Sequence, residues 1–162
     1  MKTVILTIST SVANGSGEDL SGHALAELAV QAGAEVVARE ILPDDRGAIE
    51  AALRRHVESG ASLILTTGGT GLTPDDVTPE ATRAVIDRDA PGFAEAMRAE
   101  SVRHTPMGIL SRGVSGIAGQ TLIINFPGSP NSIHQLFPII APVLRHAVET
   151  LHRPPGVRTH AR

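Results

Sequence analysis

The sequence predicts an α/β fold, in which a three-layer, doubly wound and mostly parallel sheet carries an antiparallel hairpin at one edge. Apolar, β-branched runs typical of fully buried strands alternate with segments whose apolar residues recur at helical spacing. Several of these runs end in glycine-rich or acidic turns that lead into helix-capping sequences, as in parallel βα units. The dipeptide at 119–120, Gly-Gln, precedes a further apolar run and predicts the hairpin.

The size and composition of the chain are those of one globular domain. Its 162 residues are 41% hydrophobic and 19% charged, which is enough for a full core. We expect a single domain over residues 1–152, and a loose tail over residues 153–162 that begins with Arg-Pro-Pro-Gly. The three phenylalanines are the only aromatic residues, so the core has to be built from aliphatic side chains.

Charge and cysteine content exclude several classes of function. The formal net charge of −3 provides no electrostatic basis for binding nucleic acid or an anionic membrane. The absence of cysteine excludes disulfides, zinc-thiolate sites and cysteine nucleophiles. No apolar run is long enough to span a bilayer, and the first residues lack a signal-peptide pattern, so we expect a cytoplasmic protein without a membrane partner.

The first third of the chain predicts strands at residues 3–8, 34–42 and 61–67, and helices at 23–32 and 46–58. The segment 9–22 between the first strand and the first helix is small, polar and glycine-rich, which predicts a loop at the carboxyl edge of the sheet. Such a loop either contributes to a ligand site or is a plain surface loop. Asp44 follows the second strand, and its structural alternative is the N-cap of the next helix.

A glycine turn follows the third strand, in the segment 63–79 (LILTTGGTGLTPDDVTP). Gly68, Gly69 and Gly71 arrive together with Thr70 between them. Glycine permits positive φ and lets another group approach the backbone closely. A strand that ends in such a turn directs backbone N–H groups outward, which suits a phosphate or another anion.

Two carboxylates, Asp75 and Asp76, come directly after the glycine turn. Carboxylate and phosphate oxygens together are what Mg²⁺ prefers, so the order of strand, glycine turn and acids predicts a magnesium–phosphate site. The structural alternative is a tight βα connection with two solvated aspartates. Thr78 is expected to cap the next helix, over 80–88, with Pro79 at its first position.

The second half of the chain predicts a helix at 93–102, a strand at 121–126 and a long helix at 131–152. Pro138 and Pro142 are expected to kink or break the long helix near residue 137. Between the first of these helices and the strand, Ser111 and Arg112 place a hydroxyl beside a guanidinium. This pair suits a phosphate or carboxylate, and the alternative is an ordinary salt bridge.

A second glycine turn, with Gly128 followed by Ser129 as a helix cap, comes after the strand 121–126. The four loops at 9–22, 43–44, 68–76 and 127–131 all follow strands. In doubly wound folds the carboxyl ends of the strands form the ligand crevice, so these loops can converge. The residues therefore predict a phosphate-binding, Mg²⁺-dependent site.

Four stretches of the sequence resemble the Mog/MoaB family, the molybdopterin adenylyltransferases of molybdenum cofactor biosynthesis. They are TTGGTGLTPDDVTPEAT at 66–82, PGF at 91–93, TPMGILSR at 105–112 and LIINFPGSPN at 122–131. The similarity runs from residue 4 to about residue 151, so 1–152 is expected to be one molybdopterin-binding domain. The resemblance implies a three-layer α/β fold and a homo-oligomer, a trimer or less often a hexamer.

The resemblance also implies a reaction in which molybdopterin and ATP, with Mg²⁺, give adenylylated molybdopterin and pyrophosphate. It assigns catalysis and metal binding to Asp44 and Asp76. The expected nucleotide- and pterin-binding residues are Ser9, Asp19, Ser21, Gly68, Gly69, Thr70, Gly71, Ser111, Gly128 and Ser129. One departure is Thr10, because an acid commonly follows the serine of the first loop in the family.

Two alternatives accompany this expectation. One is a molybdopterin-binding or carrier protein of the same pathway that has no adenylylation activity. The other is a related nucleotide-processing enzyme that consumes ATP without the pterin. Pyrophosphate release from ATP and molybdopterin separates adenylyl transfer from the first alternative, and ATP consumption without the pterin would indicate the second.

Overall fold

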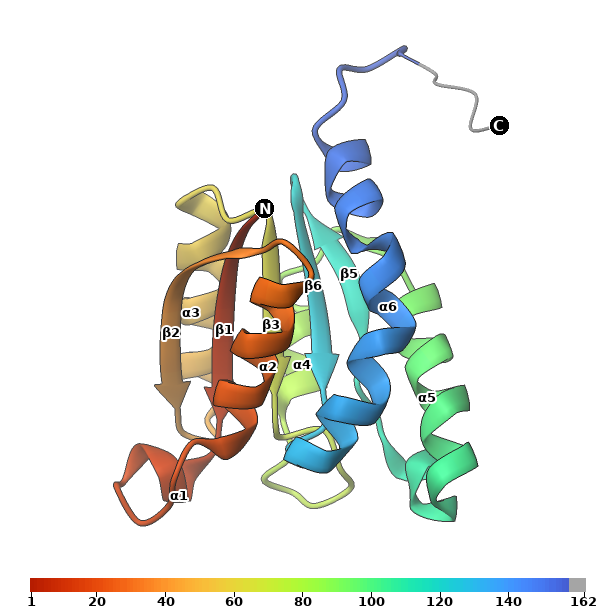
Figure 1. Cartoon of the computed structure of the whole chain (residues 1–162). Helices are drawn as coiled ribbons and strands as arrows, with labels where there is room; N and C mark the ends of the chain where they lie inside the picture. Colours follow the sequence, from red (N-terminus) through yellow and green to blue (C-terminus); the bar gives the residue numbers. More distant parts are fainter. Residues whose placement is uncertain (158–162) are drawn as a thin grey trace.

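The computed structural model describes residues 1–157. One six-stranded sheet, in the order β2-β1-β3-β6-β5-β4, forms the middle of the molecule (Figure 1). The strands are β1 (Lys2–Ile8), β2 (Glu35–Leu42), β3 (Leu63–Thr67), β4 (Arg88–Asp89), β5 (Ser115–Ala118) and β6 (Thr121–Phe126). The helices are α1 (Thr10–Ala13), α2 (Leu20–Gln31), α3 (Arg46–Glu58), α4 (Thr78–Arg83), α5 (Gly92–His104), the 3₁₀ helix η1 (Pro106–Leu110) and α6 (Pro130–Leu151).

The pairing of the strands confirms the predicted fold class. β1 is parallel to β2 and to β3, and β3 is parallel to β6. β5 forms the predicted hairpin with β6 and is antiparallel to it, and β4 adds a short antiparallel edge. In residues 1–157, no helix is both long and apolar enough to cross a membrane.

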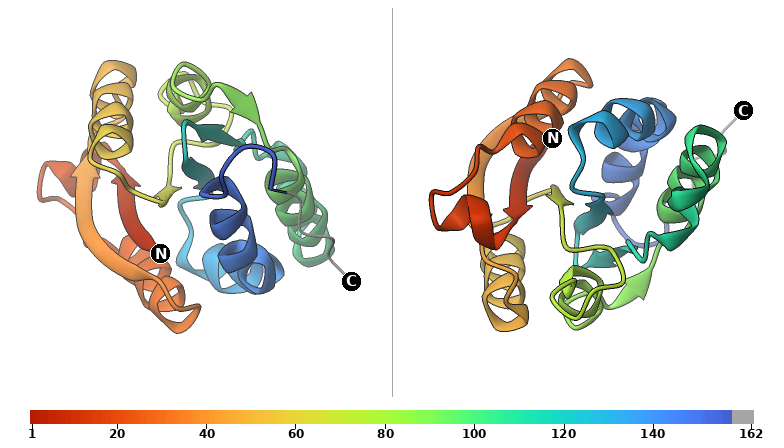
Figure 2. Two further views of the ribbon diagram at one scale, coloured as in Figure 1. Left: turned by 90° about the horizontal axis from the view of Figure 1, so that it is seen from above. Right: turned by 90° about the horizontal axis from the view of Figure 1, so that it is seen from below.

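Helices cover both faces of the sheet, so that the molecule has three layers. Seen along the strands, α3 and α4 lie on one face, and α2, α5 and α6 on the other (Figure 2). Alternate residues of each central strand serve the two cores: Ile64 packs with α3 and α4, whereas its neighbours Leu63 and Leu65 pack with α2 and α6. This alternation is the strand period of two, and it explains why the central strands read as continuous apolar runs.

The chain reverses its winding direction between β1 and β3. From β1 it passes through α2 to β2 at one edge, and from β2 it returns through α3 to β3 on the other side of β1. The carboxyl ends of β1 and β3 therefore border the crevice at a topological switch point, where α/β folds bind ligands. The turn after β3, helix α1 and the start of α6 lie together at this end of the sheet, at the bottom of Figure 1.

Several predicted local features differ from the structure. The segment 9–22 is not all loop, because it contains α1 and the first turn of α2, and α4 ends at Arg83 rather than at residue 88. α6 runs continuously through Pro138 and Pro142, so the predicted break is wrong. Both prolines lie on the exposed side of α6, where water can bond the carbonyl groups that they leave free. The predicted tail begins after α6, and its residues 158–162 lie outside the described part of the chain.

Candidate functional site

The glycine turn after β3 touches the turns that follow both neighbouring strands. Gly68 has φ of +98° and Gly69 has φ of +64°, a conformation that L side chains rarely adopt. A Cβ on Gly68 would lie 2.2 Å from the backbone oxygen of Ile8, at the end of β1. A Cβ on Gly128, after β6, would lie 3.3 Å from the Cα of Gly68. The three turns therefore form one closely packed floor at the carboxyl edge.

Two buried threonines hold this floor together. The Thr78 hydroxyl donates to the carbonyl of Gly68 at 2.9 Å, and the Thr78 amide donates to the carbonyl of Gly69 at 3.1 Å. On the strand side, the Thr67 hydroxyl donates to the carbonyl of Pro127 at 2.8 Å. The prediction that Thr78 caps α4 is wrong: Thr78 is the first helical residue, and its side chain fixes the glycine turn instead.

Asp44 lies beside this floor and is held by Thr10. The Thr10 amide and hydroxyl both donate to Asp44 Oδ2 at 2.8 Å, and the same hydroxyl accepts the Asp44 amide at 2.9 Å. The other carboxylate oxygen, Oδ1, lies 3.4 Å from the position that a Cβ on Gly69 would take. Asp44 does not cap α3, because Asp45 accepts the Ala48 amide at 2.7 Å and takes that role.

Asp76 lies at the other end of the glycine turn. Thr73 donates to Asp76 Oδ2 from its hydroxyl at 2.7 Å and from its amide at 2.9 Å. A Cβ on Gly71 would lie 2.8 Å from the same oxygen. Burial acts to raise the pKa of the Asp76 carboxyl, but hydrogen bonds from Thr73 and Gly71 and the nearby charge of Arg112 outweigh it. The pKa of Asp76 is therefore below its usual value, so the group is a carboxylate at neutral pH.

Arg112, which is half-buried, stabilises the outer part of the glycine turn. Its guanidinium donates to the carbonyl of Gly71 at 2.7 Å and to the carbonyl of Asp76 at 2.6 Å. It also forms a short ion pair with Glu80 of α4. Of the two interpretations offered for this residue, the salt bridge is the one present in the structure.

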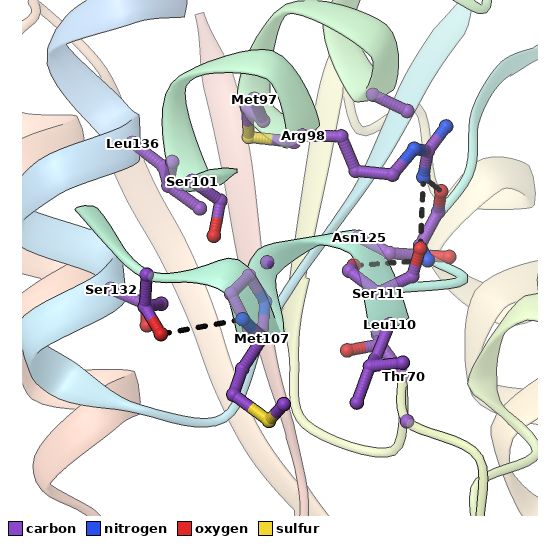
Figure 3. A pocket seen from close by; sticks show the side chains of 16 residues that line it. Thr70, Met97, Arg98, Ser101, Met107, Leu110, Ser111, Asn125, Ser132 and Leu136 are labelled. Carbon is purple, nitrogen blue, oxygen red and sulfur yellow. Dashed lines mark hydrogen bonds between the residues drawn. The ribbon is translucent and has the colours of Figure 1, made fainter. Parts of the chain in front are cut away.

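The glycine turn borders two separate cavities. The first, which we name the Asp44 cavity, has a volume of about 350 Å³. It is lined by Thr7, Ile8, Ser9, Val12, Glu18, Leu20, Ser21, Asp44, Gly68, Gly69, Gly128 and Pro130. The second, which we name the Ser111 cavity, has a volume of about 220 Å³ and lies between α5, η1 and the start of α6 (Figure 3). Thr70 and Gly71 place the same turn in its wall, opposite apolar side chains such as Met97 and Leu136.

Nine of the twelve residues expected at the site line these cavities, Asp19 and Ser129 have structural roles, and Asp76 lines neither cavity. Ser9, Ser21, Asp44, Gly68, Gly69 and Gly128 line the Asp44 cavity, and Thr70, Gly71 and Ser111 line the Ser111 cavity. Asp19 instead caps α2 through the Gly22 amide and forms an ion pair with Arg39 at 3.0 Å. Ser129 caps α6, next to the Asp44 cavity.

The two carboxylates Asp44 and Asp76 fit a Mg²⁺ ion whose other ligands are substrate phosphates and water. Within residues 1–157, no group of three or more His, Cys, Asp or Glu side chains could hold a metal ion without help. Asp44 and Asp76 flank a turn in which a Cβ at Gly69 or Gly71 would collide with neighbouring groups. One or two carboxylates completed by substrate phosphates and water is the usual arrangement for Mg²⁺.

Sequence reasoning missed three polar residues of this region. Thr73, which binds Asp76, resembles any turn threonine in the sequence. Asn125 is a buried member of β6 whose amide nitrogen donates to Thr66 and Thr82 at 3.0 Å each. A single asparagine inside an otherwise apolar strand was the available signal for it. Arg98 of α5 lines the Ser111 cavity. Its position in the helical sequence pattern is the same as that of an ordinary surface arginine, so the sequence carries no signal for it.

The chain is similar to proteins of molybdenum cofactor biosynthesis along almost its whole length. The Drosophila melanogaster "Molybdenum cofactor synthesis protein cinnamon" is 40% identical over 149 residues, which are 91% of this chain and 25% of that protein. The "Molybdopterin adenylyltransferase" of Helicobacter pylori strain J99 is 38% identical over 150 residues, 91% of this chain and 85% of that enzyme. The chain thus spans about a quarter of the first relative and most of the second.

A solved structure agrees with these sequence relatives. The molybdopterin biosynthesis enzyme MoaB of Thermus thermophilus superposes with a TM-score of 0.89 at 44% identity, and the match covers 95% of this chain and 98% of that one. The family described as "probable molybdopterin binding domain" matches residues 4–146, which include the glycine turn, Asp44, Asp76 and both cavities. The chain therefore belongs to the molybdopterin-binding domain family of MoaB and Mog.

Proposed function

We propose that this protein transfers the adenylyl group of ATP to the terminal phosphate of molybdopterin and releases pyrophosphate. The observation that carries the proposal is that one rigid glycine turn, flanked by Asp44 and Asp76, borders two cavities. A reaction that joins two substrates needs two adjoining sites with a common catalytic edge. The relatives named as molybdopterin adenylyltransferases support this choice of substrates.

The residues of this chain would act by position and charge. The amides of Gly68 and Gly71 are already bonded, to the carbonyl of Phe126 and to Asp76, so phosphates would accept from the amides of Gly69 and Thr70, and the serines of the two cavities add hydroxyl donors. Asp44 and Asp76 would hold Mg²⁺, which when bound offsets the repulsion between two polyanions. Thr10 and Thr73 keep each carboxylate in one orientation, so little reorganisation is required when the substrates bind.

The remaining parts of the proposal rest on the family. We infer a homo-oligomer, with a trimer as the expected form, as the resemblance to Mog/MoaB implies. Exposed apolar residues on several elements, among them Ile139 and Val143 of α6, offer surface for such contacts. We place the protein in the cytoplasm, since the proposed reaction depends on ATP and Mg²⁺. Both inferences are testable by light scattering and by fractionation.

Pyrophosphate release from ATP and molybdopterin, measured with and without Mg²⁺, tests the reaction. We expect release that needs all three components. Asp44→Asn and Asp76→Asn should each lower turnover at least about a hundredfold, whereas Asp75→Asn, on the exposed neighbour of Asp76, should leave it unchanged. Binding of molybdopterin without pyrophosphate release would indicate the carrier protein instead. ATP consumption that needs no pterin would indicate a different nucleotide-processing enzyme.

A further inference from the structure

A third cavity, which we name the arginine cavity, lies on the far side of the segment that carries Ser111. It has a volume of about 480 Å³ and is walled by the end of α4, β4, the first two turns of α5 and residues 111–115. Three arginines line it, Arg83, Arg98 and Arg112, against one acid, Asp89. The chain as a whole has a net charge of −3, so this cavity is a locally positive region of a net negative protein.

The three arginines differ in how far their charge is already neutralised. Arg112 is paired with Glu80 and bonded to two carbonyls, so it has little left to offer a ligand. Arg83 is exposed at the end of α4, and it acts on Glu80 only as a distant charge. In residues 1–157, neither Arg83 nor Arg98 has a carboxylate at ion-pair distance.

Arg98 is the informative member, because it is half-buried and still carries an unneutralised charge. Its Nη1 donates to the carbonyls of Gly113 at 2.7 Å and Ser111 at 3.3 Å (Figure 3). Within the described residues, its Nε and Nη2 have no partner. A half-buried guanidinium without a carboxylate is costly, and two unused N–H donors in a fixed plane match the geometry of an oxyanion.

We propose that the arginine cavity is a second anion site, which binds a free oxyanion of the phosphate class through Arg98 and Arg83 without Mg²⁺. This goes beyond the proposed transfer reaction, because the site has neither Asp44 nor Asp76 in its wall. It lies next to the Ser111 cavity, with which it shares Ala94, Arg98, Ser111 and Gly113. An anion bound there is therefore in contact with the wall of the substrate region without entering the Asp44 cavity.

A purely structural role for Arg98 predicts a different result, and one substitution separates the two. Arg98→Gln keeps an amide that can donate to the carbonyls of the 111–113 segment but removes the charge. If Arg98 only ties α5 to that segment, this variant behaves like the native protein. If the charge binds an anion, affinity falls by about tenfold or more, the usual loss for a charge-assisted hydrogen bond.

The test is calorimetric titration of the full chain with inorganic pyrophosphate in the presence of EDTA. We expect one binding event, weakened at least about tenfold in Arg98→Gln and also weakened in Arg83→Gln. The matched control is Arg103→Gln on the same helix, whose exposed side chain pairs with Glu100 and which should bind as the native protein does. Asp44→Asn should also bind normally, so a failure of the proposed reaction does not affect this result.

Three outcomes would overturn the proposal: no binding to the native protein, equal binding to Arg98→Gln, or tighter binding to Asp44→Asn. The last would place the pyrophosphate in the Asp44 cavity, because without Mg²⁺ the Asp44 carboxylate repels an anion bound there. Melting curves accompany each titration, so that a folding defect is recognised as such. If Arg98→Gln is unstable, two other variants replace it. Arg98→Lys keeps the charge and should retain binding, and Arg83→Gln, at an exposed position, should weaken it.

Discussion

Arg112 makes the most specific stability prediction, because its three partners all belong to the glycine turn and its helix. Arg112→Ala removes two hydrogen bonds from a charged donor to the carbonyls of Gly71 and Asp76, at 2.7 and 2.6 Å, and the ion pair with Glu80. The paired side chains are 33% and 35% exposed, so solvent screening limits the ion pair to about 1 kcal/mol. The two carbonyl bonds add about 1 kcal/mol each, so the free energy of unfolding should fall by about 3 kcal/mol.

Thermal unfolding followed by circular dichroism measures this loss. For a chain of this length about 1 kcal/mol corresponds to about 2–4 °C, so the melting temperature of Arg112→Ala should fall by about 6–12 °C. Arg112→Lys, which can reach only part of the set, should lose about half as much. The matched control is Arg88→Ala, because Arg88 is 63% exposed and its pair with Asp87 measures 3.7 Å; we expect a change of about 2 °C or less.

One result would refute this reasoning. If Arg112→Ala melts within about 2 °C of the native protein, neither the carbonyl hydrogen bonds nor the ion pair of Arg112 contributes much to the free energy of unfolding. A double-mutant cycle with Glu80→Ala separates the contributions, since only the ion pair should appear as coupling, at about 1 kcal/mol.

Three further expectations follow from the same region. Thr10→Val keeps the shape of the side chain but removes the hydroxyl that bonds Asp44 in both directions; pyrophosphate release should drop about tenfold or more while the melting temperature changes by no more than about 4 °C. Gly68→Ala places a Cβ 2.2 Å from the backbone oxygen of Ile8 in a left-handed conformation; a loss of at least about 2 kcal/mol is expected in chemical denaturation, and a stable variant would contradict the packing described. The hydrogen bond from its arginine partner lowers the pKa of Glu80. A depressed pKa contributes stability that is complete above the ordinary value near 4.5 and is lost as the pH falls through the folded-state value, so melting temperatures recorded from about pH 6 to pH 3 should fall more steeply in the native protein than in Glu80→Gln.

The central part of the fold could be predicted from the sequence because its signals are local. β1, β3 and β6 are runs of residues buried on both faces, and their few polar members, such as Asn125 of β6, leave the apolar runs recognisable. β4 was not predicted, since it consists of Arg88 and Asp89, both exposed, and is a strand only through its pairing with β5. A short strand that exists only because it pairs with a neighbour has no strand pattern in its own sequence.

The sequence predicts which kinds of polar residue lie at the site, but not which residue takes which role. The sequence places Asp44 and Asp45 side by side after β2, and nothing local determines which of them caps α3. The structure decides through a distant residue, because Thr10 of α1 takes Asp44 and leaves the cap to Asp45. Arg98 illustrates the same limit, since its lack of a carboxylate partner is a property of the folded surroundings.

The contact between the glycine turns after β3 and β6 restricts how this protein can diversify. Gly68 occupies the space that a side chain on Gly128 would need, and the Thr67 hydroxyl donates to the carbonyl of Pro127. Insertions or larger side chains in either turn would separate two strands at the centre of the sheet. New ligand preferences are therefore expected to arise in the cavity walls that lie outside these turns, among them the short helices α1 and η1.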